Sequence, residues 1–126
     1  MTTTTAAEQT AVEYFKAKLQ FETTPFTLKY NLEKDKVLLL DVREKKDFDA
    51  EHIPGAFSLP LAELEKNLSK LPKDKTLVTY CWHIACNLAP KAALFLAEKG
   101  FKVQELVGGL EQWKKKLPTE GSASKN

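Results

Sequence analysis

Residues 37–42 read Val37-Leu38-Leu39-Leu40-Asp41-Val42, a continuous apolar run with charged residues on both sides. A run without polar alternation is typical of a strand that is buried on both faces of a sheet. Residues 76–80 (TLVTY) and 103–107 (VQELV) are predicted to be two further core strands, and helical patterns lie between the three segments. Strands that alternate with helices predict an α/β fold, with a central parallel sheet and helices on both faces.

Shorter elements are expected around these strands. We predict helices at 44–51, 61–68, 88–99 and 110–117, a short strand at 56–59, and turns at 52–56 and at Gly108-Gly109. Ligands of open parallel sheets bind at the carboxyl ends of the strands, so we expect a functional site at that edge.

The chain of 126 residues has room for one compact domain with short flanking segments. Residues 6–21 and 26–33 have helical patterns, and we expect residues 1–34 to form a helical extension that packs on the domain. Residues 35–118 form the domain itself. Residues 119–126 (TEGSASKN) are predicted to be a disordered tail.

Composition argues against several classes of partner. Basic residues number 19 and acidic residues 17, so a net charge of +2 predicts neither nucleic-acid nor membrane binding. Two cysteines, five positions apart, favour a reducing compartment over a disulfide framework. No apolar run approaches the ~18 residues of a membrane helix, and residues 1–20 do not match a signal or transit peptide. We therefore expect a cytoplasmic protein.

Residues 81–87 (CWHIACN) lie between the strand at 76–80 and the helix at 88–99, where a parallel sheet presents its reactive groups. Unpaired backbone N–H groups and the positive end of a helix dipole favour a thiolate there. We therefore expect a nucleophilic Cys81 with a pKa below the ordinary ~8.5, and Asn87 as the N-cap of the helix. The alternative is that both cysteines are small buried apolar residues.

Three motifs resemble the signatures of rhodanese-like domains, in the order of that family. They are Asp41-Val42-Arg43-Glu44 with Phe48 and Glu51-His52-Ile53-Pro54-Gly55-Ala56, then Val78-Thr79-Tyr80-Cys81, then Gly108-Gly109-Leu110-Glu111-Gln112-Trp113. The resemblance spans residues 37–116 and implies a rhodanese-like fold with a central parallel sheet of five strands. It also implies sulfur transfer through a persulfide on Cys81 and an internal ion pair for Arg43.

The loop departs from the pattern of this family. Family sulfurtransferases usually have a basic residue after the cysteine, a central glycine, and Arg or Thr at the fifth position, where this chain has Trp82, Ile84 and Cys86. The loop also looks longer than usual, as in phosphatase and arsenate-reductase relatives, which place an arginine in it. Residues 81–90 contain no lysine or arginine, so we expect weak use of the dianion thiosulfate and a donor of lower charge.

The candidate site is the catalytic Cys81 with the active-site loop residues Trp82, His83, Ile84, Ala85, Cys86 and Asn87. Cys86 is a resolving thiol that oxidation links to Cys81, a second sulfur acceptor, or a core residue. His83 stabilises a thiolate or is simply exposed, and Trp82 forms an apolar wall or anchors the loop. Asp41 is the candidate supporting group from outside the loop. The cysteines and His83 supply three soft ligands where structural zinc uses four, so no metal is expected.

These observations predict a sulfurtransferase that moves sulfane sulfur through a Cys81 persulfide to a thiol or another nucleophilic acceptor. The backbone amides of residues 82–87 are expected to cradle the persulfide. The donor is a small-molecule or protein-bound sulfane sulfur, and no cofactor is expected. Two alternatives stay open: a non-catalytic binding or redox-sensing module, and a Cys-dependent phosphatase or arsenate reductase.

Overall fold

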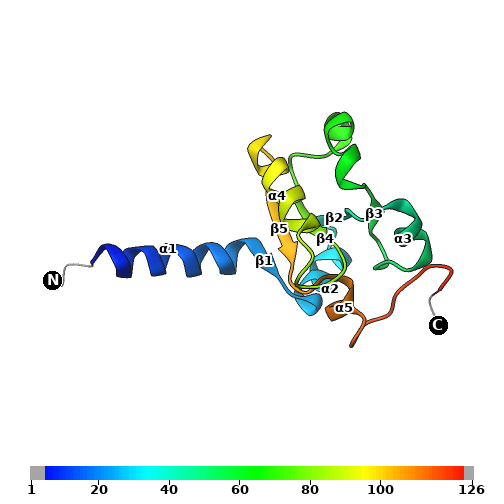
Figure 1. The fold of residues 1–126 in the computed structure, drawn as a ribbon, viewed down its shortest axis with the longest axis horizontal. Coiled ribbons are helices and arrows are strands. Elements are labelled where there is room, and N and C mark those ends of the chain that lie inside the picture. Colours follow the sequence, from blue (N-terminus) through cyan, green and yellow to red (C-terminus); the bar gives the residue numbers. More distant parts are fainter. Residues whose placement is uncertain (1–4, 124–126) are drawn as a thin grey trace.

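The computed structural model describes residues 5–123, and its centre is a parallel sheet of five strands (Figure 1). The strands are β1 (Glu22–Thr23), β2 (Val37–Asp41), β3 (Phe57–Ser58), β4 (Thr76–Tyr80) and β5 (Val103–Leu106). Their order across the sheet is β1-β5-β4-β2-β3, and every neighbouring pair is parallel. The predicted α/β fold with a five-stranded parallel sheet is therefore confirmed.

Helices connect the strands. They are α1 (Ala6–Phe21), α2 (Pro25–Glu33), α3 (Lys45–Ala50), α4 (Leu88–Glu98) and α5 (Gly109–Trp113), with the 3-10 helices η1 (Leu61–Glu63) and η2 (Glu65–Lys70). Two tight helices thus replace the single one predicted at 61–68, and α5 ends before the predicted residue 117. Among residues 5–123, no helix is long and apolar enough to cross a membrane.

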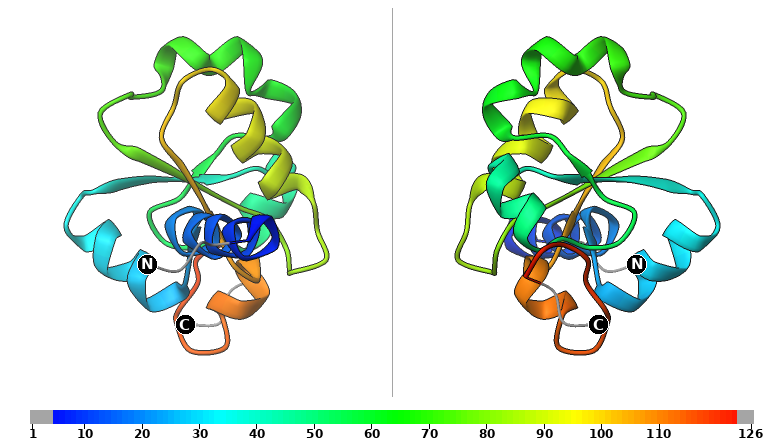
Figure 2. Two further views of the ribbon diagram at one scale, coloured as in Figure 1. Left: turned by 90° about the vertical axis from the view of Figure 1, so that its left-hand side faces the viewer. Right: turned by 90° about the vertical axis from the view of Figure 1, so that its right-hand side faces the viewer.

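Each face of the sheet has its own apolar core, because successive strand residues point to opposite sides. In β2, Leu39 packs with Leu28 of α2 and Trp113 of α5. The next residue, Leu40, belongs to the opposite core with Leu96 of α4. Figure 2 shows the same arrangement, with α4 and the 3-10 helices on one side of the sheet and α2 and α5 on the other. Helices therefore cover both faces, as the apolar strands predict.

The first 34 residues, expected to form one packed extension, divide into two parts in the structure. Residues 22–33 belong to the body, because β1 pairs with β5 and Leu28 of α2 is fully buried. Strand β1 is only two residues long and has no apolar pattern, so the sequence did not predict it. Helix α1 has no buried residue and extends away from the body (Figure 1). Residues 1–4 lie outside the described residues.

The segment 119–126, expected to be a disordered tail, packs on the domain over its described part. Glu120 forms an antiparallel bridge with His52, in which each backbone N–H donates to the other residue's carbonyl oxygen, at 2.9 and 2.8 Å. Thr119 is 8% exposed. Backbone pairing orders this segment although its composition is polar. Residues 124–126 lie outside the described residues.

Candidate active site

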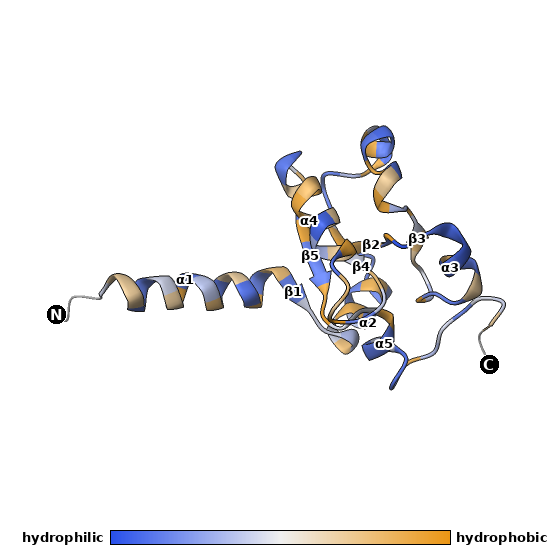
Figure 3. Cartoon of the chain, in the orientation of Figure 1, coloured by the Kyte–Doolittle hydropathy of each residue, from blue (hydrophilic) through white to orange (hydrophobic). Residues whose placement is uncertain are grey.

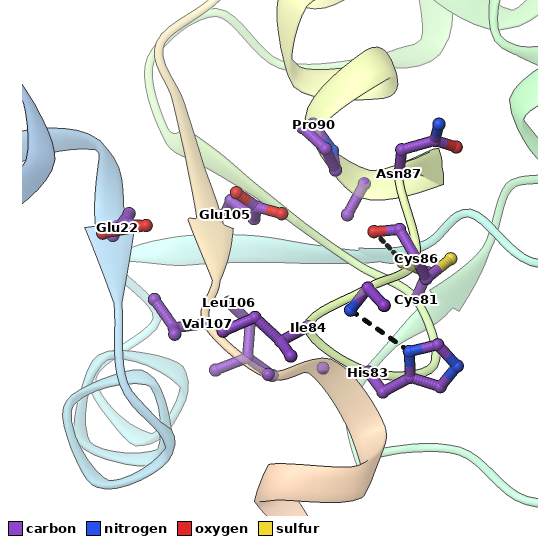
Figure 4. A pocket seen from close by; sticks show the side chains of 14 residues that line it. Glu22, Cys81, His83, Ile84, Cys86, Asn87, Pro90, Glu105, Leu106 and Val107 are labelled. Carbon is purple, nitrogen blue, oxygen red and sulfur yellow. Dashed lines mark hydrogen bonds between the residues drawn. The ribbon is translucent and has the colours of Figure 1, made fainter.

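Cys81 follows the last residue of β4, at the carboxyl end of the strand. It lines a cavity of about 250 Å³ whose other walls come from the loop, the first turn of α4 and the end of β5 (Figure 4). This is the edge where parallel sheets bind ligands. The loop residues that line the cavity are His83, Ile84, Ala85, Cys86 and Asn87, whereas Trp82 lies outside it.

The loop is held in a tight curve by hydrogen bonds of its own. The Cys86 backbone N–H donates to the His83 carbonyl oxygen at 3.0 Å. The Ala85 N–H donates to His83 Nδ1 at 3.2 Å, a bond that Figure 4 marks with a dashed line. The Cys81 thiol donates to the Cys86 carbonyl oxygen at 3.5 Å. Because Nδ1 accepts a hydrogen bond, it carries no proton in this arrangement. His83 is exposed and shapes the loop rather than the thiol environment.

The Gly108-Gly109 turn brings the start of α5 against the first residues of the loop. The Leu110 N–H donates to the Cys81 carbonyl oxygen at 2.9 Å, and the Glu111 N–H donates to the Trp82 carbonyl oxygen at 2.9 Å. Gly108 and Gly109 have φ angles of +80° and +58°. A Cβ on Gly109 would lie 2.5 Å from the Cys81 carbonyl oxygen. The close approach of α5 to the loop therefore requires glycine here.

The two thiols have different electrostatic environments. Burial and the hydrogen bond to Cys86 raise the pKa of Cys81 to about 12, although backbone N–H groups, including that of Ala89, act against this rise. Burial also acts to raise the pKa of Cys86. The hydrogen bond from Cys81, backbone N–H groups and the charge of Arg43 outweigh it, so the Cys86 pKa is lowered. The prediction that Cys81 has the depressed pKa is therefore wrong, because Cys81 belongs to the apolar core.

Asp41, the candidate supporting group, does not reach the cavity. Its carboxylate forms a fully buried ion pair with Arg43, with Nη2–Oδ2 at 2.7 Å and Nε–Oδ1 at 3.0 Å. Arg43 also donates to the Glu51 carbonyl oxygen at 2.6 Å. The Arg43 guanidinium carbon lies 4.3 Å from the centre of the Trp82 ring, so Trp82 anchors the loop to the ion pair. Through its charge Arg43 also acts on Cys86, which sequence reasoning missed.

Two carboxylates that the sequence analysis did not single out line the same cavity. Glu22 of β1 and Glu105 of β5 are partners in the register of adjacent strands, and they lie across the cavity from the loop (Figure 4). Burial and the neighbouring Glu22 raise the pKa of Glu105. Lys18 pairs with Glu22 at 2.6 Å, but the described residues that line the cavity include no lysine or arginine. This wall, formed by Glu22 and Glu105, is called the acidic wall below.

At the start of α4, backbone N–H groups act on the two thiols, and no side chain caps the helix. Asn87 occupies the predicted N-cap position, but its side chain makes no capping hydrogen bond. The backbone N–H groups of Leu88 and Ala89 instead act on Cys86 and Cys81, respectively. Within residues 5–123, no three His, Cys, Asp or Glu side chains form a group that could hold a metal ion.

The family model of the rhodanese-like domain matches residues 24–116, so this chain belongs to the rhodanese-like domain family. The thiosulfate sulfurtransferase GlpE of Coxiella burnetii is 36% identical over 96 residues, which cover 75% of this chain and 87% of that protein. The HTH-type transcriptional regulator Rv0324 of Mycobacterium tuberculosis is 38% identical over 82 residues, 65% of this chain. The match covers only 36% of that regulator's length.

Solved structures show the same fold. The BH2092 protein of Bacillus halodurans superposes with a TM-score of 0.84 and 37% identity, covering 92% of this chain and 88% of that one. A thiosulfate sulfurtransferase of Pseudomonas aeruginosa has a TM-score of 0.72 and 28% identity, covering 83% of this chain and 20% of that one. Because the relatives include both sulfurtransferases and a regulator, the activity of this chain has to be argued from its own site.

Proposed function

We propose that the chain is a sulfurtransferase in which Cys81 accepts a sulfane sulfur atom, holds it as a persulfide and passes it to a thiol. The observation that carries the proposal is the position of Cys81, which lines a cavity at the sheet edge against the backbone N–H groups of Trp82 and Ala89. Membership of the rhodanese-like family and the sulfurtransferase GlpE among the relatives support the same activity.

The first step loads the cysteine. Cys81 Sγ attacks the outer sulfur of a persulfide donor, R–S–S⁻, and a new S–S bond forms. The S–S bond of the donor breaks, and its electron pair leaves with R–S⁻, which takes up the proton lost by Cys81. The Cys81 thiol donates to the Cys86 carbonyl oxygen, and the pKa of the Cys86 thiol is lowered, so a Cys86 thiolate is positioned to relay this proton.

The second step unloads the sulfur. A thiolate acceptor attacks the outer sulfur of the Cys81 persulfide, and the Cys81 thiolate leaves with the electron pair of the broken S–S bond. Backbone N–H groups of the loop and of the first turn of α4 stabilise the negative charge on sulfur in both steps. Because backbone groups supply this stabilisation, the loop can function without a lysine or arginine.

The donor that fits this cavity has a low negative charge. Thiosulfate is a dianion, and the cavity presents to it the acidic wall, in which Lys18 pairs with Glu22 but Glu105 makes no ion pair among the described residues. The persulfide group of a small molecule or a protein carries one negative charge at most, and Ile84, which is 81% exposed, offers an apolar contact to the rest of the donor. We therefore assign a persulfide rather than thiosulfate as the preferred donor. The chemistry needs reduced thiols, which a reducing compartment such as the cytoplasm provides.

Mass spectrometry of the intact protein tests the activity. After incubation with a low-molecular-weight persulfide and removal of the donor, we expect a mass gain of one sulfur atom that a thiol then reverses. Cys81→Ser is expected to abolish the gain, and Cys86→Ser is expected to slow the loading but retain the gain. Sulfur loading that survives in Cys81→Ser, or wild-type protein that no sulfane donor loads, would contradict the proposal.

A second candidate function, redox sensing, is favoured by the closeness of the two cysteines, since the Cys81 thiol donates a hydrogen bond to the carbonyl oxygen of Cys86. Peroxide oxidises one thiol to a sulfenic acid and is reduced to water, and the second thiol then displaces a further water as the disulfide forms. Loss of both thiols after peroxide, in a protein that sulfane donors do not load, would favour the sensor. A phosphatase or arsenate reductase gains no support, because no arginine lines the cavity within the described residues.

A further inference from the structure

Helix α1 lies outside the apolar core, and its link to the candidate site is the ion pair of Lys18, near its end, with Glu22. The rhodanese-like family model starts at residue 24, beyond the end of α1 (Ala6–Phe21). None of the 16 residues of α1 is buried, and the helix projects from the body at one end of the molecule (Figure 1). Apart from the pairing of Lys18 with Glu22, the proposed sulfur transfer gives α1 no role.

The exposed surface of α1 includes a stripe of large apolar side chains, which we call the α1 stripe. It consists of Val12, Phe15 and Leu19, whose exposed fractions are 43%, 58% and 82%. Spacings of three and four residues place them on one side of the helix, and Figure 3 shows apolar residues along its whole length. An isolated helix of this length is marginal in water, and most helices gain stability by burying such a stripe. We therefore expect a partner to bury the α1 stripe.

The charges of α1 indicate which partner fits. Glu8 and Glu13 lie in the first half of the helix, and Lys16 and Lys18 lie in the second half. Two copies of α1 in antiparallel orientation bring the acidic half of each helix beside the basic half of the other, and their helix dipoles also oppose. A parallel pair would place like charges together. The helix is about 24 Å long, so an antiparallel pair keeps the two bodies at opposite ends.

We propose that α1 is a dimerisation element that pairs with α1 of a second copy of this chain, antiparallel and about a twofold axis. The axis passes near the middle of the helix, so that Val12 of each copy packs against Phe15 of the other. Leu19 then lies near the acidic end of the opposite helix, where Lys18, which pairs with Glu22 of its own chain, also comes near Glu8. This isologous contact buries the α1 stripe of both copies at once. The inference does not depend on the proposed sulfur transfer.

Sedimentation equilibrium of the full chain tests the dimer. Wild type is expected to dimerise, and Leu19→Glu is expected to raise the dissociation constant about tenfold or more, because twofold symmetry introduces the change twice. Leu94→Glu is the matched control, since Leu94 is 62% exposed on α4 and outside α1, and it should leave the dimer intact. A wild-type monomer at every concentration, or a dimer that Leu19→Glu leaves unchanged, overturns the proposal.

Charge reversal tests the antiparallel pairing. The variants E8K/E13K and K16E/K18E carry helices of a single charge sign, so each alone is expected to dissociate about tenfold or more readily. An equal mixture of the two is expected to form a heterodimer as tight as the wild-type dimer. Failure of the mixture to associate contradicts the pairing. Binding of a monomeric wild type to anionic phospholipid vesicles would assign α1 to a membrane surface and also overturn the proposal.

Discussion

Strands β2 and β4 pair directly and end side by side, but different kinds of group follow them. At the end of β2, Asp41 and Arg43 form a fully buried ion pair, and Arg43 also donates to the Glu51 carbonyl oxygen. Beyond β4, the Cys81 thiol is buried too, but its partners are backbone groups and the second thiol, Cys86. The comparison indicates that the ion pair fixes this edge of the sheet. Under the proposed function, the Cys81 thiol, held by weaker bonds, keeps a lone pair available to attack a sulfur donor.

Arg43→Ala tests whether the buried ion pair of Asp41 and Arg43 stabilises this edge of the sheet, and it has the largest expected effect. The change leaves Asp41 buried without its counter-charge, and breaking a buried pair in this way costs about 3–5 kcal/mol of unfolding free energy. Urea unfolding followed by circular dichroism measures it. Lys45→Ala is the control, because its pair with Asp49 is exposed and should contribute less than about 1 kcal/mol. A loss in Arg43→Ala no larger than in the control would mean that the ion pair does not hold the edge.

Gly109→Ala tests the close contact between the start of α5 and the backbone of Cys81. The new Cβ meets the Cys81 carbonyl oxygen and the φ angle of +58° is strained for alanine, so we expect a loss of about 2–5 kcal/mol and slower persulfide loading. Gly55→Ala is a matched control. Gly55 also has a positive φ, +91°, but a Cβ there has nothing within 4 Å, so its cost is about 1–2 kcal/mol. Equal losses in the two variants would show that the contact with Cys81 is unimportant.

The fold could be predicted because its central strands are strongly patterned. The apolar runs of β2 and β4 are long enough to be recognised without neighbours, and the motifs at Gly108-Gly109 and Cys81 carry the resemblance to the family. Strand β1 could not be predicted, because two residues have no period and pair only through the edge of β5. The order of residues 119–123 could not be predicted for a similar reason, because it depends on backbone pairing with His52 and not on composition.

The location of the Cys81 loop in the fold could be predicted, but the electrostatics of its thiols could not. The sequence places Cys81 and its loop after a buried strand, which fixes where a nucleophile can stand. It does not show that Cys81 faces the apolar core while Cys86 lies nearer to solvent, and this depth decides which thiol ionises. Nor does it show that Asp41 turns toward Arg43, because the choice between a ligand and an ion pair depends on side-chain direction.

The two thiols are expected to ionise in a fixed order, Cys86 before Cys81. Because the pKa of Cys86 is lowered and that of Cys81 is raised, we expect iodoacetamide to label Cys86 at least about tenfold faster at neutral pH. The pH midpoint for Cys86 labelling should lie below the ordinary ~8.5. It should move upward in Cys81→Ala, which removes a hydrogen bond to the Cys86 thiolate. Peptide mapping across pH measures both effects, and predominant labelling of Cys81 would reverse our assignment.

The smallest expected effect concerns the acidic wall. The carboxylate of Asp41 is neutralised by Arg43, but Glu105 is half-buried in the cavity and makes no ion pair among the described residues, so its charge acts on a ligand. Removing it in Glu105→Gln should raise kcat/KM for thiosulfate about two- to fivefold relative to a singly charged persulfide. High salt should shrink the difference, because screening weakens the repulsion. The control Glu98→Gln changes an exposed carboxylate outside the cavity and should leave the ratio unchanged. A ratio that Glu105→Gln leaves unchanged would mean that the loop alone sets the charge of the donor.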